Sequence, residues 1–281
     1  MTPSSFDGAR AGGVTTCALL CESTGLPILV KMRNALRPSI HRSRPAPTGI
    51  LEGLRGAVIV FAKDVRIEMA TREIVTTTTF FAALVTILTS VALTTGPQAT
   101  IQVGPGTLWL AVLFSSILAL GRSWQREREE SALLGLLVSP LPRAAIWLGK
   151  AAAVFVFLSA VEVIVVPLVA LVFNVDLTHV VGALALVMVF GTVGVAATGT
   201  LFGAMTVRTR ARELLLATVL FPLLSPALLS SVAATREIFY ATSTGQSVDL
   251  HEVGDWLLLL AVFDFVAIAG GMVLFGAILE D

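Results

Sequence analysis

Residues 122–143 read RSWQREREESALLGLLVSPLPR and connect two long apolar runs of the chain. The run before them ends at Leu120, and the run after them begins at Ala144. Charged residues open the stretch, leucines fill four of five consecutive positions in its middle, and prolines close it. Loops usually lack such a leucine cluster. The order of residues therefore predicts a short helix held close under a membrane, with an apolar surface for a partner.

The composition indicates the class of protein. Of the 281 residues, 56% are hydrophobic and 14% are charged, with a mean hydropathy of +0.88. A soluble domain has about 25% charged residues. Apolar stretches of about 20 residues recur, and each can cross a bilayer as a helix. The chain is therefore predicted to be an all-α polytopic membrane protein, and its net charge of zero says nothing about partners.

Six apolar segments are predicted to span the membrane. The third and fourth are long enough to tilt. Gly104, Pro105 and Gly106, near the start of the second, predict a turn or a kink there. The six segments are residues 74–95, 102–121, 144–173, 180–205, 214–233 and 256–278.

The lysines and arginines predict the orientation, because these residues concentrate in cytoplasmic segments. With the N-terminus in the cytoplasm, 18 of the 19 basic residues lie inside, and Arg236 lies in an external loop. The even number of spans then returns the C-terminus to the cytoplasm. The longest external loop is predicted over residues 234–255, which carry mainly acidic charges.

Residues 1–52 differ from the rest of the chain. They are rich in Ser, Pro, Arg and Gly, and their first 47 residues hold only two acidic side chains, Asp7 and Glu22. An organellar transit peptide, a disordered tail or a start codon assigned too early would each explain this composition. We expect a disordered or artefactual N-terminal extension.

A helix is predicted directly before the first span, over about residues 54–72. Apolar residues recur there at spacings of four, three, four and four, which places them on one helical face. Such a helix lies in the cytoplasmic interface of the membrane or packs on the protein as a surface helix, and the two placements are compatible. The apolar face consists of Leu54, Val58, Phe61, Val65 and Met69.

The stretch from residue 122 also carries signals for the ends of its helix. Ser123 is a suitable N-cap, and Glu127, Glu129 and Glu130 follow in the first turns, where the helix dipole favours carboxylates. Ser139-Pro140 ends the helix. Its leucine surface would dock into a groove on a cytoplasmic partner; the alternative is a solvated loop. The chain has no G-x-x-x-x-G-K-[ST] segment, so any ATP hydrolysis that drives it occurs in another subunit.

Several segments, in their order and spacing, resemble the CcmB family. Members of that family are the membrane subunits of the haem exporter-type ABC complex of cytochrome c maturation. The resemblance covers about residues 52–281. It is carried by K-D-V-R-I-E-M-A-T-R-E (63–73), R-S-W-Q-R-E-R-E (122–129), G-L-L-V-S-P-L-P-R (135–143), I-W-L-G-K (146–150), V-E-V-I-V-V-P-L (161–168), G-T-V-G (191–194), G-T-L-F-G (199–203), R-A-R-E (210–213) and F-P-L-L-S-P (221–226).

The resemblance implies a fold similar to type-2 ABC exporters, with an interfacial elbow helix, six spans and a coupling helix between spans two and three. It implies that residues 123–139 form this coupling helix and fit a groove on an ATPase subunit. The six-span permease domain would cover residues 53–281. The residues expected to couple to the ATPase are Arg126, Glu127, Arg128, Glu129, Leu133, Leu136 and Leu137.

The resemblance also implies partners and a location. The partners would be a CcmA-like cytoplasmic ATPase, CcmC-like and CcmD-like membrane subunits, a periplasmic haem chaperone and a second copy of the permease, in the bacterial inner membrane. ATP would act through the partner subunit, and haem would be a transported or handled ligand. The chain itself is expected to be neither an enzyme nor a nucleic-acid binder.

Three other functions are compatible with parts of the sequence. A type-2 ABC permease for a lipid, glycan or drug would carry the same coupling helix. A secondary transporter would be expected to show inverted repeats and paired intramembrane charges, and the sequence shows neither. A membrane scaffold without transport activity is the third class.

Two carboxylic acids, Glu162 and Asp264, fall near the middle of the third and sixth spans. A charge at that depth costs about 2.5–3.5 kcal/mol, so each acid requires a partner, water or a proton. The acids either line a path for substrate or coupling, or form hydrogen bonds between helices. Candidate partners are Thr86, Ser90, Ser115 and Ser116.

The remaining motifs have simpler interpretations. Gly199 and Gly203, four residues apart, are predicted to let two helices approach closely. His179 and His251 fall in external loops and are expected to be solvated, so no haem ligand is assigned. The two cysteines lie within residues 1–52 without a nearby histidine, and no metal site is predicted.

Overall fold

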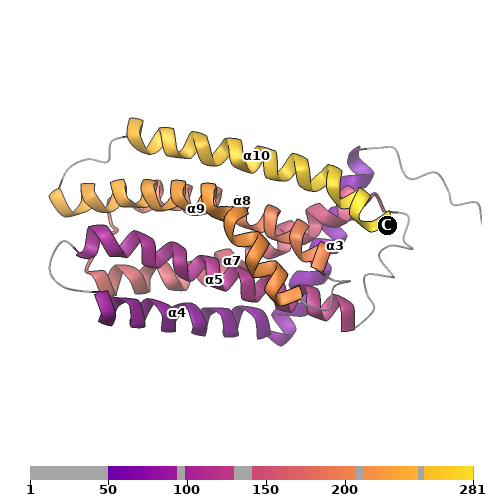
Figure 1. Ribbon diagram of the computed structural model, residues 1–281, viewed down its shortest axis with the longest axis horizontal. Coiled ribbons are helices and arrows are strands. Elements are labelled where there is room, and N and C mark those ends of the chain that lie inside the picture. Colours follow the sequence, from indigo (N-terminus) through magenta and orange to yellow (C-terminus); the bar gives the residue numbers. More distant parts are fainter. Residues whose placement is uncertain (1–49, 94–98, 130–140, 207–211, 246–249, 281) are drawn as a thin grey trace, which may run out of the picture. The chain divides into compact units, whose positions relative to one another are not determined.

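The computed structural model describes residues 50–93, 99–129, 141–206, 212–245 and 250–280. These residues form seven helices and no strand, within one compact unit (Figure 1). The helices are α3 (Ile50–Thr71), α4 (Glu73–Leu93), α5 (Ala99–Glu129), α7 (Arg143–Phe173), α8 (Val181–Thr206), α9 (Arg212–Thr244) and α10 (Leu250–Glu280).

The six helices from α4 to α10 are each long and apolar enough to cross a membrane, within the residues that the structure describes. The predicted number of spans is therefore confirmed, and the chain is a multi-pass all-α membrane protein. Gly53 lies against Pro142, and Gly276 lies against Arg143. These contacts bring the start of α3, the start of α7 and the end of α10 to one end of the bundle (Figure 1).

Three predicted boundaries are wrong because the helices are longer than expected, and one of them is the start of α10, at Leu250 rather than at residue 256. Helix α5 continues beyond residue 121 to Glu129, and α9 continues beyond residue 233 to Thr244. Most of the predicted external loop 234–255 is therefore helical. Hydropathy marks where a helix leaves lipid, whereas Arg, Glu and Gln remain good helix formers outside it.

Prolines lie inside three of the spanning helices. Pro105 lies in the second turn of α5, and the helix continues through it, so of the predicted turn or kink the turn is absent. Pro167 lies inside α7, and Pro222 and Pro226 lie inside α9. The ribbon of α9 changes direction along its length (Figure 1), as expected where a proline removes a backbone hydrogen bond.

Helix α3 is the predicted helix before the first span, although it begins at Ile50 rather than near residue 54. It packs on α7 through a face that includes the buried Ala57 and Val60. Leu54, Val58 and Met69 of the predicted apolar face stay exposed. Because the buried face and the exposed apolar face are different, α3 can pack on the protein and lie in the membrane interface at once.

The corner between α3 and α4 depends on two residues. Arg72 adopts a left-handed conformation, with φ of 53°, which ends α3. The Glu68 carboxylate accepts a hydrogen bond of 2.9 Å from the Val75 backbone N–H. Glu68 therefore caps the first turn of α4, where backbone N–H groups lack helical partners.

Large side chains on one helix pack against glycines of another throughout the bundle. Trp109 and Trp124 of α5 cover Gly191 and Gly203 of α8, where an added Cβ would lie 2.2 and 2.1 Å from the indole rings. Trp147 of α7 covers Gly271 of α10 in the same way, at 2.1 Å. Only glycine leaves room for such contacts, which let the helices approach closely.

Helix α8 takes part in much of this packing and contacts four other helices, α5, α7, α9 and α10. Its Gly199 faces Leu120 of α5, and an added Cβ would lie 2.3 Å from a Leu120 methyl group. Leu120 and Trp124 are one turn apart on α5, and they face Gly199 and Gly203, which are one turn apart on α8. These two glycines thus lie where α5 and α8 are in contact.

Adjacent glycines of α10 provide a matched test of this packing. Gly271→Ala should lower the free energy of unfolding by about 1–3 kcal/mol, because the buried Trp147 ring must move. Gly270→Ala adds a methyl group in open space and should be neutral or stabilise by up to about 1 kcal/mol. Thermal unfolding of the detergent-purified chain measures both, and equal effects of the two substitutions would contradict the packing argument.

Candidate functional site

Four charged residues from three helices meet at the α3 end of the bundle. We call Lys63 and Asp64 of α3, Glu127 of α5 and Lys150 of α7 the junction. The Lys150 Nζ lies 2.8 Å from Glu127 Oε1 and 3.1 Å from Asp64 Oδ2. The Lys63 Nζ lies 2.6 Å from the same Glu127 oxygen and 3.0 Å from Asp64 Oδ1. Two positive and two negative charges therefore balance within hydrogen-bonding distance.

The two central members of the junction are shielded from solvent. The side chains of Lys150 and Glu127 are 3% and 5% exposed, and the Lys150 ammonium group lies 5.0 Å from the centre of the Trp124 ring. A cation at this distance is attracted to the face of an indole. Loss of one partner in such a buried pair leaves the other charge uncompensated, which costs about 3–5 kcal/mol.

The charge of Lys63 is also stabilised by the junction. Burial lowers the pKa of Lys63, but the hydrogen bond to Glu127 and the negative charges of Asp64 and Glu127 outweigh it. The pKa of Lys63 is therefore above its usual value of 10.5. Its contribution to stability is complete below pH 10.5 and is lost only as the pH rises through the higher folded-state pKa.

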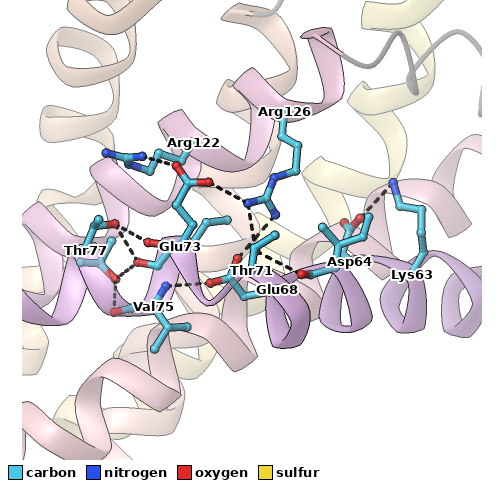
Figure 2. Close-up of polar contacts among 12 residues, drawn as sticks. Lys63, Asp64, Glu68, Thr71, Glu73, Val75, Thr77, Arg122 and Arg126 are labelled. Atoms are coloured by element: carbon cyan, nitrogen blue, oxygen red, sulfur yellow. Dashed lines mark hydrogen bonds and ion pairs between the residues drawn. The ribbon is translucent and has the colours of Figure 1, made fainter.

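A second group of ion pairs connects α5 to the α3–α4 corner (Figure 2). Arg122 Nη1 lies 2.6 Å from Glu73 Oε1, and Arg126 Nη2 lies 3.4 Å from Glu73 Oε2. Arg126 Nη1 also lies 3.5 Å from the buried Glu68. The Glu73 side chain is half-exposed, so each of its two pairs is expected to contribute about 0–1 kcal/mol.

The structure corrects the predicted start of the coupling helix. Ser123 lies inside α5 and does not cap a new helix, because α5 is continuous from Ala99 to Glu129. The side chains of Arg126 and Glu127 pair with α3, α7 and the start of α4, and these contacts favour the helical extension. Their coupling to an ATPase stays a prediction.

The other residues expected to couple are placed only in part. Arg128 and Glu129 are the last two residues of α5. Leu133, Leu136 and Leu137 lie outside the described residues, between the end of α5 and the start of α7.

Glu162 and Thr192 form a hydrogen bond between α7 and α8. The Thr192 hydroxyl donates to Glu162 Oε1, and both side chains are buried. The sequence suggested other partners, but the hydroxyls of Thr86 and Ser116 donate to carbonyls of their own helices. Ser115 donates to the Thr78 carbonyl of α4 at 3.5 Å.

Asp264 of α10 packs against a different side of α8 from Glu162. Its side chain is 5% exposed, and both of its oxygens lack a hydrogen-bond partner among the described residues. An added Cβ on Gly194 would lie 2.6 Å from Asp264 Oδ1. Because residues two apart on a helix point about 200° apart, Thr192 and Gly194 place the two acids on nearly opposite sides of α8, at almost the same depth.

The two histidines that were predicted to lie in external loops are exposed. His179 lies in the α7–α8 turn, and His251 lies in the first turn of α10, 3.8 Å from Asp255. Within the described ranges, no three His, Cys, Asp or Glu side chains come together as a metal site.

Residues 55–277 match the family described as CcmB protein. The chain belongs to the CcmB family. The match begins inside α3 and ends in the last turn of α10, so it includes the junction, both intramembrane acids and the whole bundle.

Individual proteins that are similar to this chain share 29–30% of their residues with it over the matched regions. Heme exporter protein B of Bradyrhizobium diazoefficiens is 30% identical over 137 residues, which cover 49% of this chain and 61% of that protein. Heme exporter protein B of Pseudomonas aeruginosa is 29% identical over 196 residues, or 69% of this chain and 85% of that protein. The Escherichia coli K12 protein of the same name is 29% identical over 91 residues, 32% of this chain and 41% of that protein.

The junction predicts unequal effects of two glutamate substitutions. Glu127→Gln should lower the free energy of unfolding by about 3–5 kcal/mol, because the buried Lys150 loses its closest carboxylate. Glu73→Gln, at a half-exposed side chain, should cost at most about 1 kcal/mol. Adding Lys150→Met to Glu127→Gln should recover part of the loss. A double variant whose loss is the sum of the single losses would exclude this coupling.

The unpartnered Asp264 carboxyl predicts a stabilising substitution. Asp264→Asn should raise the unfolding temperature, because removing an unpaired acid from a span recovers part of a cost of about 2.5–3.5 kcal/mol. Glu162→Gln should raise it less, because Thr192 already supplies a hydrogen bond there. Thermal unfolding in detergent compares the two. A lower unfolding temperature for Asp264→Asn would mean that the carboxyl has a stabilising partner.

Proposed function

We propose that this chain is the membrane permease subunit of an ABC-type complex for cytochrome c maturation. The observation that carries the proposal is the CcmB match over residues 55–277, which includes all six spanning helices. The similar proteins from Bradyrhizobium and Pseudomonas are named Heme exporter protein B. Haem would be the exported cargo, or the complex would release a haem-loaded periplasmic chaperone.

The geometry supports coupling to ATP hydrolysis in a partner. Residues 130–142 connect α5 to α7, and they carry the leucine cluster that we propose docks on a CcmA-like cytoplasmic ATPase. The helices on both sides of this segment are joined by the Glu127–Lys150 pair and are fixed to α3 through Asp64. A displacement of the docked segment would therefore move the ends of α5 and α7 together with α3.

The assembly proposed around this subunit has further members. We place the chain in the bacterial inner membrane with both termini in the cytoplasm, as the basic residues predict. CcmC-like and CcmD-like membrane subunits and a second permease copy would complete the membrane part. This chain would hydrolyse no ATP itself.

The biological role is tested by gene deletion followed by a covalent-haem stain for c-type cytochromes, with a plasmid-borne copy as rescue. Loss of the stained bands, with b-type cytochromes intact, is the expected result. Normal bands in a strain that has no second copy of the gene would exclude cytochrome c maturation. A type-2 permease for a lipid, glycan or drug would then be the better proposal.

Docking and coupling can be separated with two variants. Leu133→Ser combined with Leu136→Ser and Leu137→Ser should abolish co-purification of the ATPase subunit, because the docking surface becomes polar. Glu127→Gln should keep co-purification but reduce the c-type cytochromes, because the joined helix ends loosen. Arg122→Gln, at an exposed pair, is the matched control and should leave both readouts unchanged. Intact co-purification of the leucine variant would contradict docking.

A further inference from the structure

A groove lies between α7 and α8 on an exposed face of the spanning bundle. Its volume is about 420 Å³, and it extends from Ser159 to Pro167 on α7 and from Val181 to Val189 on α8. Eight residue steps on each helix correspond to about 12 Å. Val163 and Val181 at its rim are 72% and 55% exposed, so the groove is open toward the bilayer.

One carboxyl group interrupts the apolar wall of this groove. Among the described residues that line it, Glu162 alone is ionisable, and Ser159 is the other polar side chain. Glu162 is 7% exposed, and the Thr192 hydroxyl holds its Oε1 from the α8 side. The carboxyl group is thus positioned by the protein, and it retains a second oxygen for a ligand.

The turn between α7 and α8 closes the groove toward the membrane surface. Leu177 in this turn lines the groove. The turn is held by Asn174, which caps α7 in a left-handed conformation, and by Asp176, which accepts hydrogen bonds from the N–H and the hydroxyl of Thr178. The hydrogen bond from the Thr178 N–H lowers the pKa of Asp176, because it stabilises the carboxylate.

The dimensions favour a small molecule over a helix of another protein. Small-molecule pockets have volumes of about 300–1,000 Å³ and apolar walls with a few placed polar groups. A partner helix would need a seam along most of the hydrocarbon core of about 30 Å, whereas this groove is about 12 Å long and ends at Leu177.

The depth of Glu162 restricts the ligand further. Glu162 lies eleven residue steps before Phe173 at the end of α7, which corresponds to about 16 Å along the helix axis. A lipid headgroup stays in the interface above this level, so the group that reaches Glu162 must belong to a molecule dissolved in the bilayer. An apolar environment strengthens a hydrogen bond to the carboxyl group, because water does not compete.

We infer that this groove binds a membrane-dissolved amphiphile whose polar group donates a hydrogen bond to Glu162. Its apolar body lies against Val166, Ala185 and Met188. An amine or a hydroxyl has the required chemistry, and an alkane lacks it. The inference concerns binding at the side of α7 and α8, and it holds whether or not the chain serves cytochrome c maturation.

A photoactivatable alkylamine tests the inference. Membranes that contain the full-length chain with its partner subunits are labelled with a long-chain amine bearing a diazirine, or with the diazirine alkane of equal length. Mass spectrometry then maps the labelled peptides. The amine should label residues 159–189 at lower concentration than the alkane, and Glu162→Gln should raise the required amine concentration about tenfold, the factor for loss of one charge-assisted hydrogen bond.

Neighbouring residues of α8 supply the steric control. Ala185→Trp fills the groove and should abolish labelling by the amine, whereas Leu186→Trp changes an exposed residue outside the groove and should not. Glu162→Gln keeps an acceptor for Thr192, so thermal unfolding should confirm that this variant folds. Equal labelling by alkane and amine, or labelling that survives Ala185→Trp, would mean ordinary lipid contact and would overturn the inference.

A benzophenone amino acid at position 163 tests whether a helix of a partner protein occupies the groove instead of a small molecule. Its crosslink to a second polypeptide in the native membrane would show that a partner helix fills the groove, and this result would also overturn the inference. Crosslinks to lipid-sized molecules alone support it. The covalent-haem stain is independent of these readouts, so the binding inference and the proposed function can fail separately.

Discussion

The ammonium group of Lys150, enclosed by Asp64 and Glu127, fixes how the ends of three helices are arranged. Its charge is buried on α7, so α3 and α5 must each deliver a carboxylate to the same point. Substitution of the pair by apolar residues could give equal stability, so stability alone does not explain it. The ion pairs specify the positions of the end of α5 and the start of α7, which flank the connecting residues 130–142.

Along the rest of the bundle, large side chains of one helix pack against glycines of another. Gly191 and Gly203 of α8 receive Trp109 and Trp124, and Gly194 receives Asp264. A helix with such contacts on several sides cannot rotate about its axis without a clash. The rotation of α8 is therefore fixed, and its Thr192 and Gly194 set the positions of Glu162 and Asp264.

The sequence predicted the number of spans and the helix before them, because lipid imposes length and hydropathy directly. It did not predict where α5 and α9 end, because helix propensity continues past the apolar core. It missed Thr192 as the partner of Glu162. Helix α8 is apolar around its whole circumference, so no periodicity indicates which residue faces α7. The junction was hidden for a related reason: Lys63, Asp64, Glu127 and Lys150 come from three separate segments, and only tertiary packing brings them together.

Helix α7 connects the two polar features of the molecule. Lys150 at the junction and Glu162 in the groove lie twelve residues apart on this one helix, or about 18 Å. Pro167 comes only after Glu162, so no proline interrupts the helix between the two side chains. Because a continuous helix resists bending, a shift of Lys150 would be transmitted to Glu162 and to its hydrogen bond with Thr192. The junction and the groove are therefore connected by one uninterrupted stretch of helix.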